Sequence, residues 1–134
     1  METKGGFLSI LRCIVISYNK IVLIDTGEKK MKRKVCFMFI NGAFKEAPNR
    51  MVMDLGAGEM IVVGVGSYDM ACRETEKLAE EGVIMIELCG GFGTIGHAKV
   101  TEAAAGRLQV GVVRFDNHPG YENLSGDEKW GEMK

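Results

Sequence analysis

The sequence predicts a single small α/β domain, built on a mainly parallel sheet of four strands with flanking helices. Three observations lead to this prediction. Four apolar runs have the length of buried strands, segments of helical character separate them, and glycines stand at most of the junctions. The pattern is compatible with two arrangements, a flavodoxin-like sheet and part of a β/α-barrel repeat.

The 134 residues divide by character into three parts. We expect residues 31–116 to form the α/β domain and residues 117–134 to form a polar C-terminal tail. Residues 1–30 contain two apolar, β-branched runs that predict a possible hairpin. Because Met31-Lys32-Arg33-Lys34 directly precedes an apolar strand, it is typical of a protein start. We therefore interpret residues 1–30 as an N-terminal extension that is marginal to the fold, and we hypothesise that it is not native to the domain.

The first half of the domain contains two predicted strands and the segment between them. Val35–Ile40 and Met60–Val65 are continuous apolar runs, which is typical of strands buried on both faces. Between them, the segment 44–55 has apolar residues at helical spacing and predicts a helix. Pro48 confines that helix mainly to its later part.

The second half alternates helices and strands. Ser67 predicts the N-cap of a helix that ends at Gly82. A third strand follows at residues 83–89, an alanine-rich helix at residues 96–105, and a fourth strand at residues 109–115. From Asp116 the chain is polar and acidic, which predicts a loop and a loosely ordered tail, with Trp130 either anchoring that tail or exposed.

Composition excludes several classes of protein. The net charge of −1 argues against nucleic-acid binding, and we interpret the basic run at residues 29–34 as a solvated lead-in to a strand. The first apolar run is too short to cross a bilayer, so we expect no membrane partner. The four cysteines are widely spaced without a CxxC pair, which argues against zinc or a disulfide framework and fits a reducing cytoplasm.

The most distinctive feature is a glycine-rich turn between the third strand and the last helix. Residues 91–96, Gly-Phe-Gly-Thr-Ile-Gly, fit the GxGxxG pattern of dinucleotide-binding proteins. However, the turn lies in the third strand–helix unit, and the residues after the next strand are too few to build a second mononucleotide half. A smaller anion bound by the amides of the helix start is the better hypothesis. The structural alternative is that the glycines only permit a tight turn and close helix packing.

Ligands of open parallel sheets bind beyond the carboxyl ends of the strands. The predicted ligand-binding residues at this edge are Asn41, Ser67, Gly90, Gly91, Phe92, Gly93 and Arg114. We expect no metal ligands, and the pattern identifies no cofactor.

Three residues near the same edge are candidate catalytic groups. Glu87 interrupts an apolar strand, where a carboxylate requires a partner, and Arg114 is the expected one. Cys89 precedes a helix start, an environment that favours a nucleophilic thiolate, with His97 or His118 as the base. The alternative for Cys89 is a small residue that fills a crowded strand end.

The motif Glu-Leu-Cys-Gly-Gly-Phe-Gly at residues 87–93 is followed by Ala98-Lys99-Val100 and by Val-Gly-Val-Val-Arg-Phe at residues 110–115. Together these segments resemble a family of small α/β proteins of unknown function, over residues 31 to about 115. The resemblance implies the domain bounds given above and brings no known activity or catalytic residue.

Three functions follow as hypotheses. The first is a protein that binds a small anionic ligand, with a phosphate or carboxylate group, at the glycine-rich turn. The second is a small cytosolic enzyme that uses Glu87, Cys89 and His97. The third is a homo-oligomeric module without a ligand, because a sheet of four short strands leaves exposed edges.

Overall fold

The computed structural model describes residues 12–17, 20–25 and 32–131, and the chain divides into two compact units, Met1–Met31 and Lys32–Lys134. In the first unit, β1 (Arg12–Ser17) pairs with β2 (Lys20–Asp25) as an antiparallel hairpin. The hairpin expected from the two apolar runs is therefore present.

The second unit is an α/β fold, which confirms the predicted class. Its elements are, in order, β3 (Arg33–Ile40), η1 (Gly42–Phe44), β4 (Asn49–Asp54), β5 (Gly58–Val65), α1 (Tyr68–Glu80), β6 (Val83–Leu88), α2 (Thr94–Ala104), β7 (Gln109–Val112), η2 (Pro119–Tyr121) and α3 (Gly126–Trp130). They build a five-stranded sheet of order β4-β5-β3-β6-β7. The prediction of four mainly parallel strands was wrong, because β4 adds a fifth strand that runs antiparallel to β5.

Helix α1 forms where the sequence predicts it, and its two ends show why. The Ser67 side chain accepts a hydrogen bond from the Met70 N–H at 3.1 Å, which confirms the predicted N-cap. At the other end, Gly82 has a φ of +82°, a conformation that glycine adopts without steric cost.

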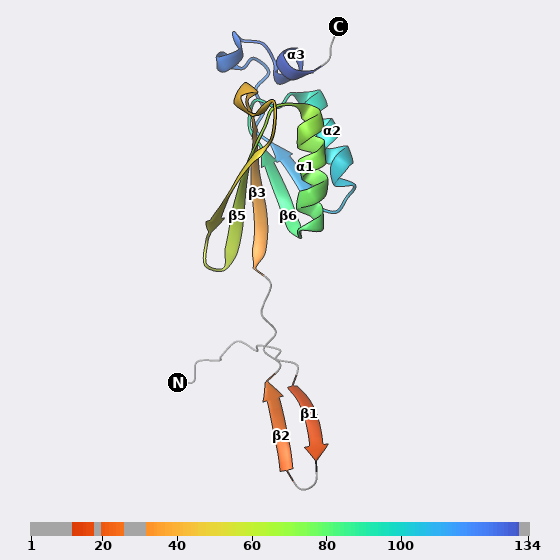
Figure 1. Ribbon diagram of the computed structural model, residues 1–134. Coiled ribbons are helices and arrows are strands. Elements are labelled where there is room, and N and C mark those ends of the chain that lie inside the picture. The colour runs from red at the N-terminus through yellow and green to blue at the C-terminus, as the bar shows by residue number, and fades with distance from the viewer. Residues whose placement is uncertain (1–11, 18–19, 26–31, 132–134) are drawn as a thin grey trace, which may run out of the picture. The chain divides into compact units, whose positions relative to one another are not determined.

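The core lies between the sheet and two helices. Figure 1 shows α1 and α2 on the same side of the sheet. Met38, Ile86 and Leu88 of the central strands are fully buried there, together with Leu78 of α1 and Val100 of α2.

Among the described residues of the Lys32–Lys134 unit, no helix covers the opposite face of the sheet, and one connection explains this. Right-handed crossovers from β5 to β6 and from β6 to β7 both proceed toward the β7 edge, so their helices lie on the same face. The connection from β3 to β5 proceeds the other way, and it contains β4 in place of a helix. Phe37 and Val62 on this second face are therefore only half-buried.

The helix predicted within residues 44–55 is thus wrong. Met51 and Leu55 were expected to belong to a buried helical stripe, but they are 60% and 51% exposed. Pro48 favours an extended residue before it, and β4 begins directly after it at Asn49. A two-residue turn then returns the chain into β5, with the Leu55 N–H bonded to the Gly58 carbonyl at 2.9 Å. That local turn favours a hairpin over a helix.

Strand β6 also differs from the expectation of burial on both faces. Glu87 is exposed because it lies on the face that the helices leave uncovered, and Ile84, 47% exposed, lies where the register with β3 shifts by one residue. Strand β7 ends at Val112, three residues before the predicted end.

The C-terminal segment is more ordered than the sequence suggested. It contains η2 and α3, and a capping box between Ser125 and Glu128 begins α3. Trp130 packs against the core and so anchors the segment. The segment lies across one end of the sheet (Figure 1). Within the ranges that the structure describes, no helix has the length and apolar character needed to cross a membrane.

Candidate functional site

The glycine-rich turn, Gly90–Gly93, follows the carboxyl end of β6 and leads into α2. The order of the parallel strands reverses between β3 and β6, which is where open α/β sheets usually bind ligands. In this protein the place is covered by the chain's own C-terminal segment.

Three glycines of the turn each lie under a different side chain of that segment. A Cβ atom added to Gly90 would overlap the Phe115 ring, and one added to Gly91 would overlap the Tyr121 hydroxyl. At Gly93 it would overlap the Asp127 carboxylate. The backbone at Gly93 has a φ of −82°, so the requirement there is for space and not for an unusual conformation. The lack of side chains on these glycines therefore allows the C-terminal segment to pack directly against the turn.

The Asp127 carboxylate accepts hydrogen bonds from the same backbone amides that would bind an anion at the start of α2. Its Oδ2 accepts a hydrogen bond from the Ile95 N–H at 3.0 Å, and its Oδ1 accepts one from the Gly96 N–H at 3.1 Å. A carboxylate at a helix N-terminus is stabilised by these donors and by the helix dipole. The first turn of α2 is an anion site whose occupant belongs to the same chain.

Tyr68 completes this network from helix α1. Its hydroxyl donates to Asp127 Oδ1 at 3.0 Å and accepts from the Gly93 N–H at 3.0 Å. Burial, together with the Asp127 carboxylate, raises the pKa of Tyr68 against the opposing effect of the Gly93 N–H. The hydroxyl consequently keeps its proton and acts as a donor. The ring stacks on Phe92 with centroids 5.7 Å apart.

A pocket of about 340 Å³ lies beside the turn. Its apolar walls come from Phe92, Val112 and Phe115, and its polar groups come from Gly93, Thr94, His97, Arg114, Asp116, Ser125 and Asp127. Four of the predicted site residues, Phe92, Gly93, His97 and Arg114, therefore meet in one place.

Arg114 is the exposed cation of this pocket. Its Nε atom lies 2.7 Å from Asp116 Oδ1, and both side chains are about three-quarters exposed. The expected pair with Glu87 is not formed, because Glu87 lies on the open face of β6, in register with Phe37 and Gly111.

The candidate catalytic residues do not converge. His97 lines the pocket, with its Nε2 atom 3.4 Å from the Val110 carbonyl oxygen. Cys89 and Glu87 lie outside that pocket's lining, and the Cys89 Sγ atom accepts a hydrogen bond from the Gly91 N–H at 3.4 Å. His118 stacks on Tyr121 with ring centroids 4.1 Å apart.

The side chains of Asn41 and Ser67 accept hydrogen bonds from backbone N–H groups of the helices that they precede. The Asn41 side chain accepts from the Ala43 N–H at 2.9 Å and caps η1, as Ser67 caps α1. Neither belongs to the lining of the pocket beside the turn.

Two residues of the network were missed by the sequence analysis, Tyr68 and Asp127. The Ser-x-x-Glu spacing at residues 125–128 is a capping-box signal and would have predicted α3. No local pattern indicates that Asp127 reaches a helix more than thirty residues away, because that contact depends on the tertiary fold.

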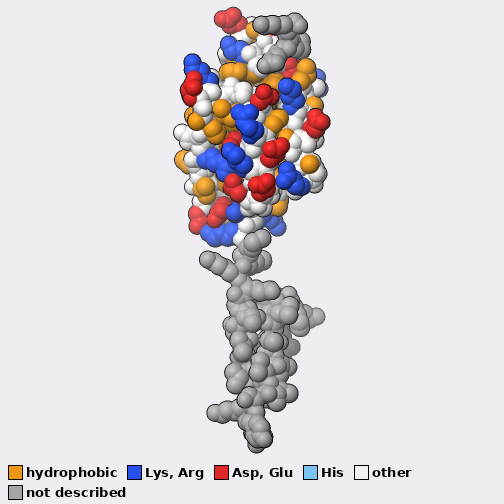
Figure 2. All heavy atoms as spheres, turned by 45° about the vertical axis from the view of Figure 1, so that its right-hand side comes forward, with side chains coloured by type: hydrophobic (Ala, Val, Ile, Leu, Met, Phe, Trp, Pro, Cys, Tyr) orange, Lys and Arg blue, Asp and Glu red, His pale blue; other side chains and the backbone are white. Residues whose placement is uncertain are grey.

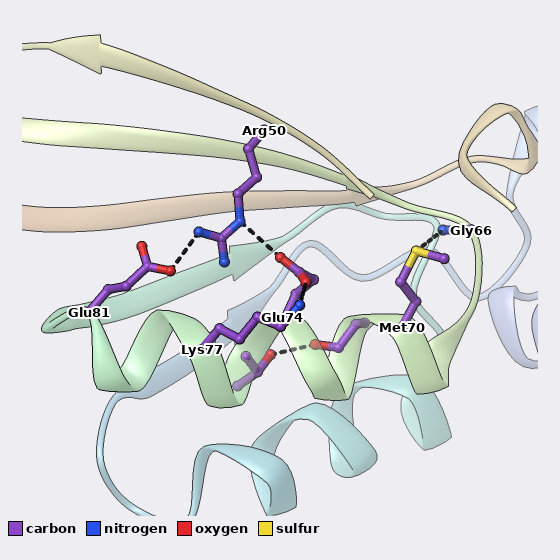
Figure 3. Close-up of polar contacts among 8 residues, drawn as sticks. Arg50, Gly66, Met70, Glu74, Lys77 and Glu81 are labelled. Carbon is purple, nitrogen blue, oxygen red and sulfur yellow. Dashed lines mark hydrogen bonds and ion pairs between the residues drawn. The ribbon is translucent and has the colours of Figure 1, made fainter. Parts of the chain in front are cut away.

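A second polar cluster connects β4 to α1. Glu74 is buried, and it accepts hydrogen bonds from Arg50 at 2.8 Å and from Lys77 at 2.7 Å. Arg50 also contacts Glu81 at 2.6 Å, so that its guanidinium lies between two carboxylates (Figure 3). These contacts hold the edge strand against the helix.

Two further features concern binding of nucleic acid and of metal ions: the distribution of charged side chains on the surface and the grouping of metal-ligand residues. Lys and Arg side chains intermix with Asp and Glu over the face shown in Figure 2, which therefore presents no continuous basic stripe. Among the described residues, no group of three or more His, Cys, Asp or Glu side chains could hold a metal ion.

Comparison with protein families identifies the domain. A model described as a family of unknown function, DUF6506, matches residues 33–128, more than two-thirds of the chain. The chain belongs to this family. The resemblance drawn from residues 87–115 is thereby confirmed, and the DUF6506 match extends further, through the segment that carries Tyr121 and Asp127. No curated protein and no solved structure matches the chain significantly.

Proposed function

We propose that this DUF6506 protein binds a small anionic molecule, bearing a carboxylate or a phosphate, in the pocket beside the glycine-rich turn. The observation that carries the proposal is the meeting of Thr94, His97 and Arg114 around one cavity at the carboxyl edge of the sheet. A volume of about 340 Å³ lies within the range of small-molecule sites.

Arg114 supplies the charge that recognises the anion. A guanidinium binds a carboxylate or a phosphate through two parallel hydrogen bonds. Its present partner, Asp116, is replaced at small cost, because exposed ion pairs contribute only about 0–1 kcal/mol. The Thr94 hydroxyl and the His97 ring add further hydrogen-bonding groups.

The remaining walls indicate what else the ligand contains. Phe92, Val112 and Phe115 favour an apolar portion, while the carboxylates of Asp116 and Asp127 favour a hydroxyl or amino group next to the anion. A hydroxylated or aminated organic acid or its phosphate ester meets both requirements. A dinucleotide does not fit this proposal, because Asp127 holds the amides that a pyrophosphate would need.

The test is a thermal-shift screen with inorganic phosphate, mononucleotides, and hydroxy and amino acids, followed by calorimetry on the hits. At least one compound is expected to stabilise the wild-type protein. Arg114→Gln is expected to weaken binding by about tenfold or more, which corresponds to the loss of one charge-assisted contact.

Arg73→Gln is the matched control, because Arg73 is an exposed arginine of α1 outside the pocket lining. It is expected to bind like the wild type. Equal binding by the Arg114 and Arg73 variants would contradict the proposal, and so would a complete lack of stabilisation across the screen.

A further inference from the structure

Strand β4 forms one edge of the sheet, and its main-chain groups alternate between two directions. Leu55 faces Gly58 across the hairpin and donates its N–H to that residue. Bonded and non-bonded residues alternate along an antiparallel strand, so Met51 and Met53 also direct their N–H and C=O groups toward β5. Those of Arg50, Val52 and Asp54 point away from the sheet.

The outer edge of β4 lacks the usual protection of an edge strand. Proteins commonly protect such strands with lysine, proline or a bulge. Strand β4 contains no lysine and no proline, and its register with β5 is continuous. Met51, Val52 and Met53 are 60%, 59% and 50% exposed. Arg50, its single cation, is turned toward α1 by Glu74 and Glu81 (Figure 3).

We propose that β4 pairs antiparallel with β4 of a second copy of this chain, about a two-fold axis at Val52. In this register Val52 lies opposite its own counterpart, and Arg50 lies opposite Asp54 at both ends. Every outward N–H and C=O of these residues then meets an outward group of the other copy. Met51 lies opposite Met53 on the open face of the sheet.

The register is self-complementary, as a two-fold interface requires. It joins two five-stranded sheets into one of ten strands, sets no like charges opposite one another and covers three exposed apolar side chains per copy. The mode is strand addition, in which main-chain hydrogen bonds provide the affinity.

The open face of the sheet is a poorer surface for the second copy. Glu87 is exposed on that face between Phe37 and Gly111 of the neighbouring strands, and packing two such faces together would bury its carboxylate with no cation opposite it in the sheet. The edge pairing leaves Glu87 in solvent. It is also independent of the proposed ligand pocket, which lies at α2 and β7, and β7 is the opposite edge of the sheet from β4.

Sedimentation of the full chain over a range of concentrations tests the pairing. The wild type is expected to show a monomer–dimer equilibrium. Val52→Pro is expected to raise the dissociation constant by roughly tenfold or more. Proline removes an N–H that the dimer requires and that the monomer does not bond to β5. Val52→Thr keeps the N–H and the β-branched shape, and it is expected to dimerise like the wild type.

A charge exchange at the same position tests the two-fold axis itself. Val52→Lys and Val52→Glu each place like charges opposite one another, and each is expected to be mainly monomeric where the wild type is dimeric. An equimolar mixture of the two is expected to restore a heterodimer. Circular dichroism checks that each variant is folded, and the charge exchange decides the question if the proline variant unfolds.

Two results would overturn the pairing. One is a wild-type chain that stays monomeric up to about 1 mM. The other is a dimer that none of the substitutions at Val52 weakens, which would place the interface elsewhere.

Discussion

Glu74 is a buried carboxylate that links β4 to α1, and its replacement should lower the free energy of unfolding. It bonds Arg50 of β4 and Lys77 of its own helix. Glu74→Gln removes the negative charge and leaves a partly buried guanidinium with Glu81 alone. Because Arg50 is 30% exposed, we expect a loss of about 2–3 kcal/mol in the free energy of unfolding, less than the roughly 3–5 kcal/mol for breaking a fully buried ion pair. Urea denaturation measures this value.

Glu76→Gln is the matched control, because Glu76 is exposed on the same helix. It is expected to change stability by less than about 0.5 kcal/mol. If both variants lost the same stability, the contacts of Glu74 would not be the cause.

The same residue makes stability depend on pH in a definite direction. Burial alone would raise the pKa of Glu74, but hydrogen bonds from Lys77 and Arg50 outweigh it and hold the pKa below its ordinary value of 4.5. A carboxyl with a lowered pKa contributes stability above its unfolded-state pKa, and that contribution is lost as the pH falls through the folded-state pKa. The stability difference between wild type and Glu74→Gln should therefore be complete at about pH 7 and decrease below about pH 4.5. A difference that stays constant down to about pH 3 would argue against this assignment.

At the scale of elements, the glycine-rich turn and α3 are expected to be energetically coupled. Gly93→Ala introduces a Cβ where the Asp127 carboxylate lies, so we expect a loss of about 1–3 kcal/mol from this overpacking. In an Asp127→Ala background the carboxylate is absent and the added Cβ has space. The loss in the free energy of unfolding caused by Gly93→Ala should then be below about 1 kcal/mol. Denaturation of the four proteins of this double-mutant cycle gives the coupling energy. If the two losses of stability were simply additive, the added Cβ at residue 93 would not be in steric conflict with the Asp127 carboxylate.

The elements that the sequence predicts correctly are those whose signals are local. Strands β3, β5 and β6 are continuous apolar runs, and α1 has a serine cap and a glycine stop. The failure at β4 has a physical cause: methionine and leucine at helical spacing also occur on an exposed strand, and only the tertiary fold decides between them.

The sequence predicts which side chains gather at the carboxyl edge of the sheet, but not their contacts. Phe92, Gly93, His97 and Arg114, all expected near that edge, line one pocket in the structure. It failed for the pairing of Arg114, because Glu87 faces the uncovered side of β6 while Asp116 lies two residues away. It also could not show that Asp127 occupies the start of α2, because no sequence pattern encodes that long-range contact.

At the scale of the whole molecule, the Lys32–Lys134 unit is expected to fold without residues 1–30. The family match begins at residue 33, and the chain divides into compact units between Met31 and Lys32. Removal of residues 1–30 should therefore leave the thermal midpoint of this unit within about 2–4 °C of its value in the full chain. Calorimetry of both proteins measures it, and a much larger decrease would show that the extension supports the fold.

The open face of the sheet also has a thermodynamic consequence. The heat capacity increment of unfolding reflects the apolar surface that becomes newly hydrated, and it is usually about 12–15 cal/mol/K per residue. Phe37 and Val62 are already partly hydrated in the folded state, as is β4 with its exposed methionines. Calorimetry on the dilute protein should therefore give an increment below that range. The curve of stability against temperature should be correspondingly flat, because a smaller increment gives it less curvature.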